Sequence, residues 1–124
     1  HDLATSGDTF KLALYTSSSS INSAATTIYT TSDEVGNSGT YAAGGGTLAG
    51  QTVTTDGTTA ICNFDDLEFT SATITARYAL IYNSSESNAA VCVLDFSTDQ
   101  TSTAGTFKID FPASGASTSI IRVA

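Results

Sequence analysis

Hydrophobic and polar residues alternate with a period of two along several short segments of the chain. Residues 9–15, TFKLALY, show this first, with Phe10, Leu12 and Leu14 on one face of an extended strand and Lys11, Ala13 and Tyr15 on the other. Residues 70–83 alternate in the same way. One face of that segment carries Ile74, Ala76, Tyr78, Leu80 and Tyr82, and Arg77 points to the other. No window of eleven or more residues repeats apolar positions at helical spacing, so the pattern predicts strands.

Turn signals separate these segments from further extended ones. We predict additional strands at residues 47–55, 58–64, 89–96, 106–111 and 117–124. Asp56-Gly57 predicts a two-residue hairpin turn, and the three glycines Gly44, Gly45 and Gly46 predict a bend through positive φ or close backbone approach. Residues 83–88 and 97–105 are predicted to be connectors, and Pro112 is expected to end the strand before it.

About eight short strands with turns between them predict an all-β fold. We expect an antiparallel β-sandwich, either jelly-roll-like or immunoglobulin-like. A length of 124 residues predicts one domain spanning residues 1–124. Because the sequence contains no methionine, we also expect that a segment precedes His1 in the full protein.

Hydroxyl groups, rather than charges, supply most of the polarity. The chain has 22 Thr and 17 Ser, whereas charged residues make up only 13%. Threonine is β-branched and favours strands. The net charge is −8, with four scattered bases, which argues against a nucleic-acid partner, and no apolar run approaches the roughly 18 residues needed to cross a bilayer. We therefore expect no nucleic-acid partner and no membrane partner.

Catalytic and metal-binding patterns are absent from the sequence. The one histidine is His1, and no G-x-S-x-G segment occurs, so serine catalysis is not expected. The acids Asp33, Glu34, Asp65, Asp66 and Glu68 could meet around a calcium ion, but acids that keep a surface soluble are the favoured interpretation. We predict that the protein is not an enzyme and has no catalytic, cofactor-binding or metal-binding residues.

Two cysteines lie on apolar predicted strands. Alternation directs Cys62 and Cys92 inward, where they could form a disulfide if their Cα atoms lie within about 7 Å, although free buried thiols are the favoured interpretation. The five tyrosines could form a sugar-stacking platform, but half-buried packing with a hydrogen-bonded hydroxyl is favoured. The segment Asn83-Ser84-Ser85 matches the N-glycosylation pattern, which we interpret as chance.

Several blocks of the sequence, taken in order, resemble a known family. These blocks are TFKLALYTSSSS, EVGNSGTYAAGG, SATITARYALIYN and AAVCVLDFSTDQTSTAGTFKIDFPASGASTSIIRVA, and together they cover nearly the whole chain. They are similar to small structural proteins of tailed bacteriophages, whose members carry extra residues before the HDL segment. Cys62 and Cys92 depart from this family, whose members place valine-like residues there.

The resemblance implies a virion component without enzymatic activity. It implies a capsid decoration or cement protein that is made in the host cytoplasm, sits on the outer capsid surface, and binds the major capsid protein and copies of itself. Two alternatives stay open: a tail or fibre adhesin that binds host-surface glycan, and a secreted carbohydrate-binding or weakly catalytic domain.

Polar and glycine-rich loops are the expected sites of contact between subunits. We predict such contacts in residues 16–27, 33–47 and 97–105, with affinity built from many copies acting together. The candidate contact residues are Ser17, Ser18, Ser19, Ser20, Tyr41, Gly44, Gly45 and Gly46.

Overall fold

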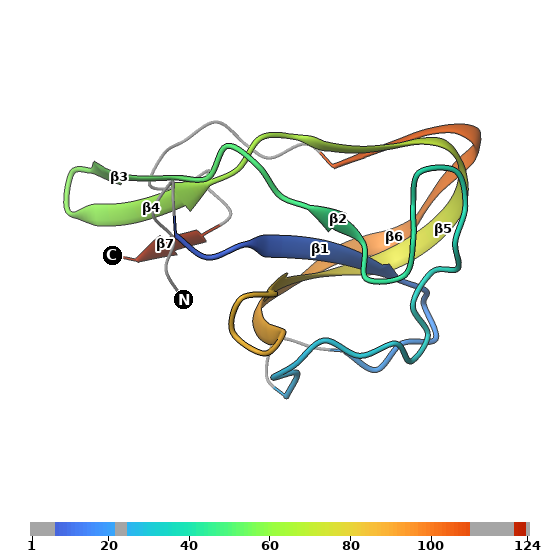
Figure 1. Cartoon of the computed structure of the whole chain (residues 1–124), viewed down its shortest axis with the longest axis horizontal. Helices are drawn as coiled ribbons and strands as arrows, with labels where there is room; N and C mark the ends of the chain where they lie inside the picture. The colour runs from blue at the N-terminus through green and yellow to red at the C-terminus, as the bar shows by residue number, and fades with distance from the viewer. Residues whose placement is uncertain (1–6, 22–24, 110–120, 124) are drawn as a thin grey trace.

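The computed structural model describes residues 7–21, 25–109 and 121–123, and this part of the chain is all-β (Figure 1). The strands are β1 (Phe10–Tyr15), β2 (Gly46–Thr47), β3 (Thr52–Asp56), β4 (Thr59–Asn63), β5 (Leu67–Asn83), β6 (Ala89–Ile109) and β7 (Ile121–Val123). They form two antiparallel sheets, one in the order β2-β1-β5-β6 and the other in the order β3-β4-β7. The predicted all-β, antiparallel class is confirmed, and a search of the described residues for a helix that could span a membrane finds none.

The long hairpin of β5 and β6 is the main element of the larger sheet. The pairing begins beside the predicted connector, where Asn83 lies opposite Ala89, and continues to Leu67 opposite Ile109. Its largest interruption lies where Arg77 alone stands against the four residues 96–99, because Ala76 pairs with Gln100 and Tyr78 pairs with Asp95. Smaller register shifts lie between Phe69 and Ile74, and between Ile81 and Tyr82, where Val91 is the extra residue of β6. Such a bulge bends a strand and increases its twist.

The bulge divides the hairpin into two arms. The inner arm, residues 78–83 with 89–95, lies beside β1, and the outer arm consists of residues 67–76 with 100–109. Figure 1 shows both strands turning around one end of the molecule and running back along its other side. The predicted connector at residues 97–105 was therefore wrong: these residues belong to β6, and Ser97 and Ala104 take positive φ where the strand is irregular.

Two cores lie on opposite faces of β1. The first core contains Phe10, Leu12, Leu14, Val35, Tyr41, Leu48, Phe64, Phe69, Ala72, Ile74, Ala76, Ala79, Ile81, Phe107 and Ile109. The second core contains Ala13, Tyr15, Ile21, Leu80 and Tyr82. The predicted alternation along β1 is therefore confirmed. The first core includes residues of both arms, so the outer arm folds back over the side chains of β1.

The predicted single face of β5 was wrong. Ile74 and Ala76 belong to the first core, but Leu80 and Tyr82 belong to the second. The inward positions change from even to odd numbers across Arg77 and Tyr78, which is where the register shifts. A strict period of two holds only while the pleat is unbroken, and the bulge breaks it.

The smaller sheet contains the predicted hairpin. β3 and β4 are joined by Gly57 and Thr58, one residue later than predicted, and Gly57 has a φ of 62°. The predicted last strand is also paired, through β7 against β4. Residues 110–120, with Pro112, and His1 lie outside the described residues. The described residues form seven strands, so the sandwich of about eight strands stays a prediction.

Candidate interaction surface

One edge of the larger sheet is closed by the chain itself. β2 pairs with only Lys11 and Leu12 of β1. Beyond β2, the backbone N–H of Val35 donates to the carbonyl of Leu14 at 2.9 Å, and the N–H of Thr16 donates to the carbonyl of Asp33 at 3.0 Å. The N–H of Leu14 donates to the hydroxyl of Tyr41 at 2.9 Å. These contacts satisfy the outer backbone groups of β1 that would otherwise invite another strand.

A carboxylate fastens the loop that makes these contacts. Glu34 accepts hydrogen bonds from the hydroxyl of Tyr41 and from the N–H of Gly44, both at 2.7 Å, and from the hydroxyl of Tyr29. Tyr82 donates its hydroxyl to the carbonyl of Gly44 at 2.5 Å. We call these residues the Glu34 clasp. The clasp holds residues 29–44 against β1 and the inner arm.

Burial of the tyrosine rings changes their acidity. Desolvation raises the pKa of Tyr41, Tyr15 and Tyr29 above the ordinary value, and the negative charge of Glu34 raises them further. Tyr15 donates its hydroxyl to the carbonyl of Thr30 at 2.7 Å, and Tyr29 stacks on Tyr82 with ring centroids 4.8 Å apart. Tyr15, Tyr41 and Tyr82 thus show the packing arrangement favoured from sequence, with hydrogen-bonded hydroxyls and buried rings.

The predicted contact residues near the clasp, Tyr41 and the three glycines, pack against other parts of the same chain. Tyr41 is only 1% exposed, so its ring cannot reach a second molecule, and that prediction is corrected. Gly44 and Gly45 have φ values of 96° and 80°, and a Cβ on Gly45 would lie 1.8 Å from the carbonyl oxygen of Leu12. A Cβ on Gly46 would lie 3.1 Å from the side chain of Leu67. These glycines allow the predicted close backbone approach.

The serine run is divided between surface and interior. Ser17, Ser18 and Ser20 are exposed, whereas Ser19 is buried and its hydroxyl accepts from the N–H of Ile21 at 3.3 Å. Three of the four predicted serine contacts therefore remain on the surface. Ser19 instead shapes the turn.

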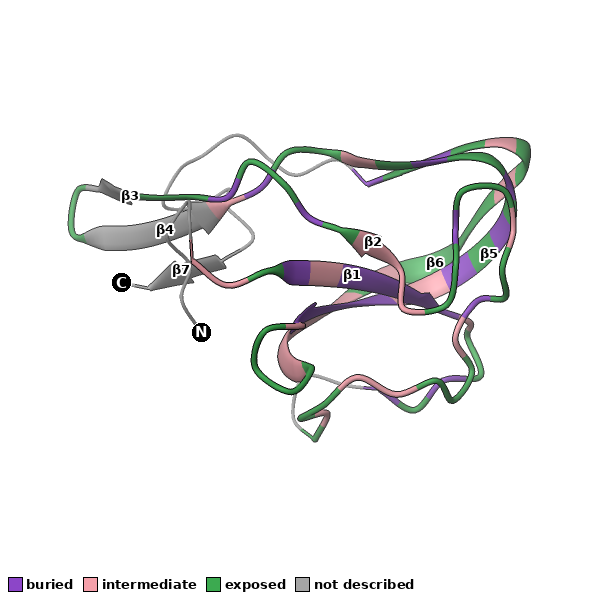
Figure 2. Cartoon of the chain, in the orientation of Figure 1, coloured by how far each residue is buried: buried purple, intermediate pink, exposed green. Residues whose placement is uncertain are grey.

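The opposite edge of the larger sheet is open. β6 ends the strand order, and within the described ranges no strand pairs with its outer side. Residues 27–29 cover only its beginning, where Ile28 forms a bridge with Ala89 and the N–H of Ala90 donates to the carbonyl of Thr27 at 3.0 Å. Figure 2 shows most of β6 as half-buried or exposed, in contrast to the largely buried β1. We call the outer side of residues 91–96 the open edge.

The open edge is apolar. Val91, Cys92, Leu94 and Phe96 pack partly against the first core, and Val93 packs partly against the second, but all five remain half-buried. Residues 89–94 contain no charged side chain. A groove of about 150 Å³ runs beside them, lined by Thr26, Ala90, Val91, Cys92 and Val93. Ile28, which bridges to Ala89, is 54% exposed.

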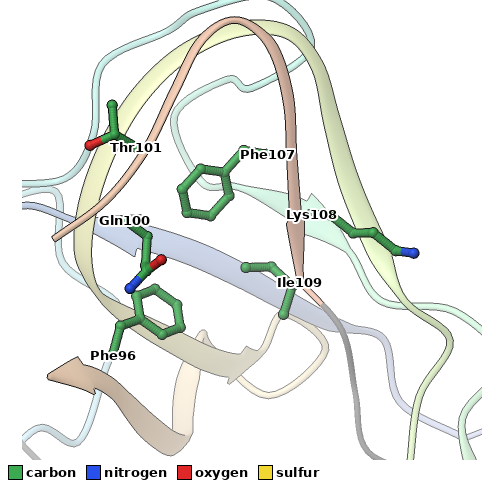
Figure 3. A pocket seen from close by; sticks show the side chains of 6 residues that line it. All are labelled: Phe96, Gln100, Thr101, Phe107, Lys108 and Ile109. Atoms are coloured by element: carbon green, nitrogen blue, oxygen red, sulfur yellow. The ribbon is translucent and has the colours of Figure 1, made fainter. Parts of the chain in front are cut away.

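A larger hollow of about 310 Å³ lies against the outer arm of β6 and the adjoining Phe96 (Figure 3). It is lined by Phe96, Gln100, Thr101, Phe107, Lys108 and Ile109. In Figure 3 the amine of Lys108 extends away from the other five side chains, so apolar and neutral polar groups dominate the lining. Phe96, one of the lining residues, belongs to the bulge.

Charges near the open edge are paired. Arg77 lies 2.9 Å from the carboxylate of Asp95, and this bond raises the pKa of Arg77 and lowers the pKa of Asp95. The guanidinium also lies 5.4 Å from the ring centroid of Tyr78. Asp95 is the one charged residue in the segment 89–98, so the open edge ends in a neutralised pair.

The remaining candidate sites are the two cysteines, the glycosylation pattern at Asn83 and the acidic residues. Cys92 is a free thiol in the larger sheet and burial raises its pKa to about 11, whereas Cys62 lies in the smaller sheet and its side chain is outside the described residues. The side chain of Asn83 is fully buried and donates to the carboxylate of Asp8 at 2.8 Å, so the glycosylation pattern is not accessible. No group of three or more potential metal ligands occurs in the part of the chain that the structure describes, including the five acids considered above.

Sequence reasoning missed the open edge. Residues 89–96 were predicted to be a core strand because most of them are apolar. Local alternation does not show the order of strands in a sheet. Residues 89–94 carry no charge, but a strand buried on both faces and an apolar edge strand look alike in sequence, so this pattern did not distinguish them. Ile28 carried no signal, because a single surface isoleucine is ordinary.

Comparison of the whole chain with protein-family models, with curated proteins and with solved structures finds no match in any of the three.

Proposed function

We propose that this chain is a non-enzymatic structural protein of a tailed-phage virion, most specifically a decoration or cement protein that binds the outer capsid surface. The open edge is the observation that carries this proposal. A protein whose surface includes a half-buried strand edge, with its one charge at Asp95 paired to Arg77, is suited to bind another protein there, since monomers ordinarily protect such edges. The resemblance of the sequence blocks supplies the virion and the capsid as the setting.

Two further features support assembly as the role. The Glu34 clasp fixes residues 29–44 on the sheet, so the loops present a preformed surface and lose little entropy on binding. The exposed serines at positions 17, 18 and 20 offer hydroxyls to a neighbouring capsid protein without adding charge. We also propose that this domain is a β-sandwich in the broad sense. Its two cores lie between β1, the outer arm that folds back, and the loop held by the Glu34 clasp.

Quantitative mass spectrometry of purified virions, followed by a heat-release assay, tests the proposal. We expect the protein in capsid fractions at a copy number matched to the number of capsomers, and we expect capsids depleted of it to release DNA at a lower temperature. Re-adding the purified protein should restore the release temperature. Recovery only in tail fractions at low copy number would favour the glycan-binding adhesin, and unchanged release temperature after depletion would contradict a cement role.

A further inference from the structure

We propose that two copies of this chain pair antiparallel along the open edge of β6, so that two four-stranded sheets become one continuous sheet. This inference rests on the proposed function only in that both assign the protein to assembly. It names the partner and the surface, which the proposed function leaves open. The partner is a second copy, and the surface is the outer side of residues 91–96 with the adjoining Ile28.

The contrast between the two edges of the sheet locates the surface. On β1 the outer backbone groups meet Gly46, Val35, Asp33 and the hydroxyl of Tyr41. On β6 the contacts from residues 27–29 stop at Ala90, among the residues that the structure describes. The chain thus closes one edge along its length and leaves the other available for a ladder of backbone hydrogen bonds.

Self-complementarity argues for a second copy as the occupant. Antiparallel pairing about Val93 places Cys92 opposite Leu94 and Val93 opposite its own copy, while Asp95 of one copy lies opposite Val91 of the other. Two copies of charge −8 repel each other, and the repulsion is least where the contact itself is uncharged, as along residues 89–94. The two Asp95 residues would then lie about 14 Å apart along the strand, which exceeds the screening length of about 8 Å at physiological salt.

Parallel pairing in register is disfavoured by the same charges. It would set Asp95 beside its own copy, and like charges directly opposite one another destabilise a sheet. Antiparallel pairing is also what a two-fold axis produces, and two-fold dimers are the commonest closed assemblies. The groove lined by Thr26 and residues 90–93 lies on the same side and can receive side chains from the second strand.

Sedimentation velocity on the full chain, from about 1 μM to about 500 μM, tests the pairing across the affinities expected of a small interface. We expect a monomer–dimer equilibrium that shifts toward the dimer as salt rises, because salt screens the repulsion between two copies of charge −8. Val93→Lys should weaken dimerisation at least about tenfold by placing two ammonium groups at the axis. The matched control is Val53→Lys, since Val53 is 50% exposed on a strand of the smaller sheet, and it should leave the equilibrium unchanged.

Hydrogen exchange of the unmodified chain tests the same surface without relying on a variant that could unfold. Amides within residues 91–96 should exchange more slowly in concentrated than in dilute samples, while the amide of Leu14 should not change. A chain that stays monomeric throughout, a dimer weakened by Val53→Lys but not by Val93→Lys, or exchange in residues 91–96 that is independent of concentration would each overturn the pairing. A monomer that still restores capsid stability would overturn this inference alone, and a dimer that fails to do so would overturn only the capsid role.

Discussion

Replacing Tyr41 with phenylalanine tests how the chain closes the edge of β1. The substitution Tyr41→Phe keeps the ring, which lies edge-on to Phe69 with centroids 4.8 Å apart, so it opens no cavity. It removes only the hydroxyl. That hydroxyl donates to the carboxylate of Glu34 at 2.7 Å and accepts from the N–H of Leu14 at 2.9 Å.

The expected loss of stability follows from these two bonds. A hydrogen bond to a charged group contributes about 1.5–3 kcal/mol, and leaving a buried N–H without an acceptor costs about 1–3 kcal/mol. Glu34 keeps Tyr29 and Gly44 as donors, so part of the first loss is recovered. We expect Tyr41→Phe to lower the free energy of unfolding by about 3 kcal/mol, which corresponds to roughly 12 °C in melting temperature for a domain of this size.

Urea denaturation and amide exchange measure the two consequences separately. Tyr78→Phe is the matched control, because within the described part of the chain no hydrogen bond is recorded for the Tyr78 hydroxyl; it should change stability by less than about 0.5 kcal/mol. In Tyr41→Phe the amide of Leu14 should also lose protection relative to its neighbours in β1. Equal losses in the two variants, or a Leu14 amide that stays protected, would refute the assignment of Tyr41 as the closing residue.

Three further predictions concern other parts of the fold. Gly45→Ala should cost more than about 3 kcal/mol in urea denaturation, because its Cβ would lie 1.8 Å from the carbonyl of Leu12 at positive φ, whereas Gly36→Ala, with no heavy atom within 4 Å of its Cβ, should be nearly neutral. Since the pKa of Tyr15 and the pKa of Tyr41 are raised in the folded state, their contribution is complete below pH 10 and is lost progressively above it; the free energy of unfolding from urea denaturation should fall above pH 10 with a slope that approaches about 1.4 kcal/mol per pH unit for each ring, and a flat profile would contradict their burial. In a Cys62→Ser background, Cys92 should react with a disulfide reagent at pH 8 at least about a hundredfold more slowly than in urea, because burial raises its pKa to about 11; equal rates would show an exposed thiol.

Local alternation was sufficient to predict β1 but not β5. β1 is six residues long and unbroken, so its faces follow directly from the order of Phe10 to Tyr15. β5 has 17 residues, and the positions that face the first core change from even to odd numbers at Arg77, which stands against four residues of β6. That mismatch arises from pairing between segments about twenty positions apart, and alternation within either segment gives no sign of it.

The tyrosines show the same division between local and long-range information. Their placement in apolar strands indicated buried rings with bonded hydroxyls, and Tyr15 and Tyr82 have this arrangement. Glu34 as the shared acceptor of Tyr29 and Tyr41 could not be predicted, since it lies in a polar loop that resembled a solvent-exposed one. Sequence therefore identified the groups that needed partners, and only the fold identified the partners.

The open edge and the hydroxyl-rich, acidic composition of the chain have a common physical explanation. A strand edge that attracts another strand also attracts wrong ones, and proteins usually guard it with lysine, proline or a covering loop. Residues 91–94 include no lysine or proline, and among the described residues their one protection is the bulge at Val91, yet the chain carries 22 threonines, 17 serines and a net charge of −8. Hydroxyls such as those of Thr75 and Thr101, 3.5 Å apart on the outer arm, keep the remaining surface hydrated, while the scattered acids repel copies that approach in other orientations. Electrostatic repulsion between two copies is then least when their neutral edges face each other. The same charge that keeps copies apart in other orientations therefore favours one paired geometry.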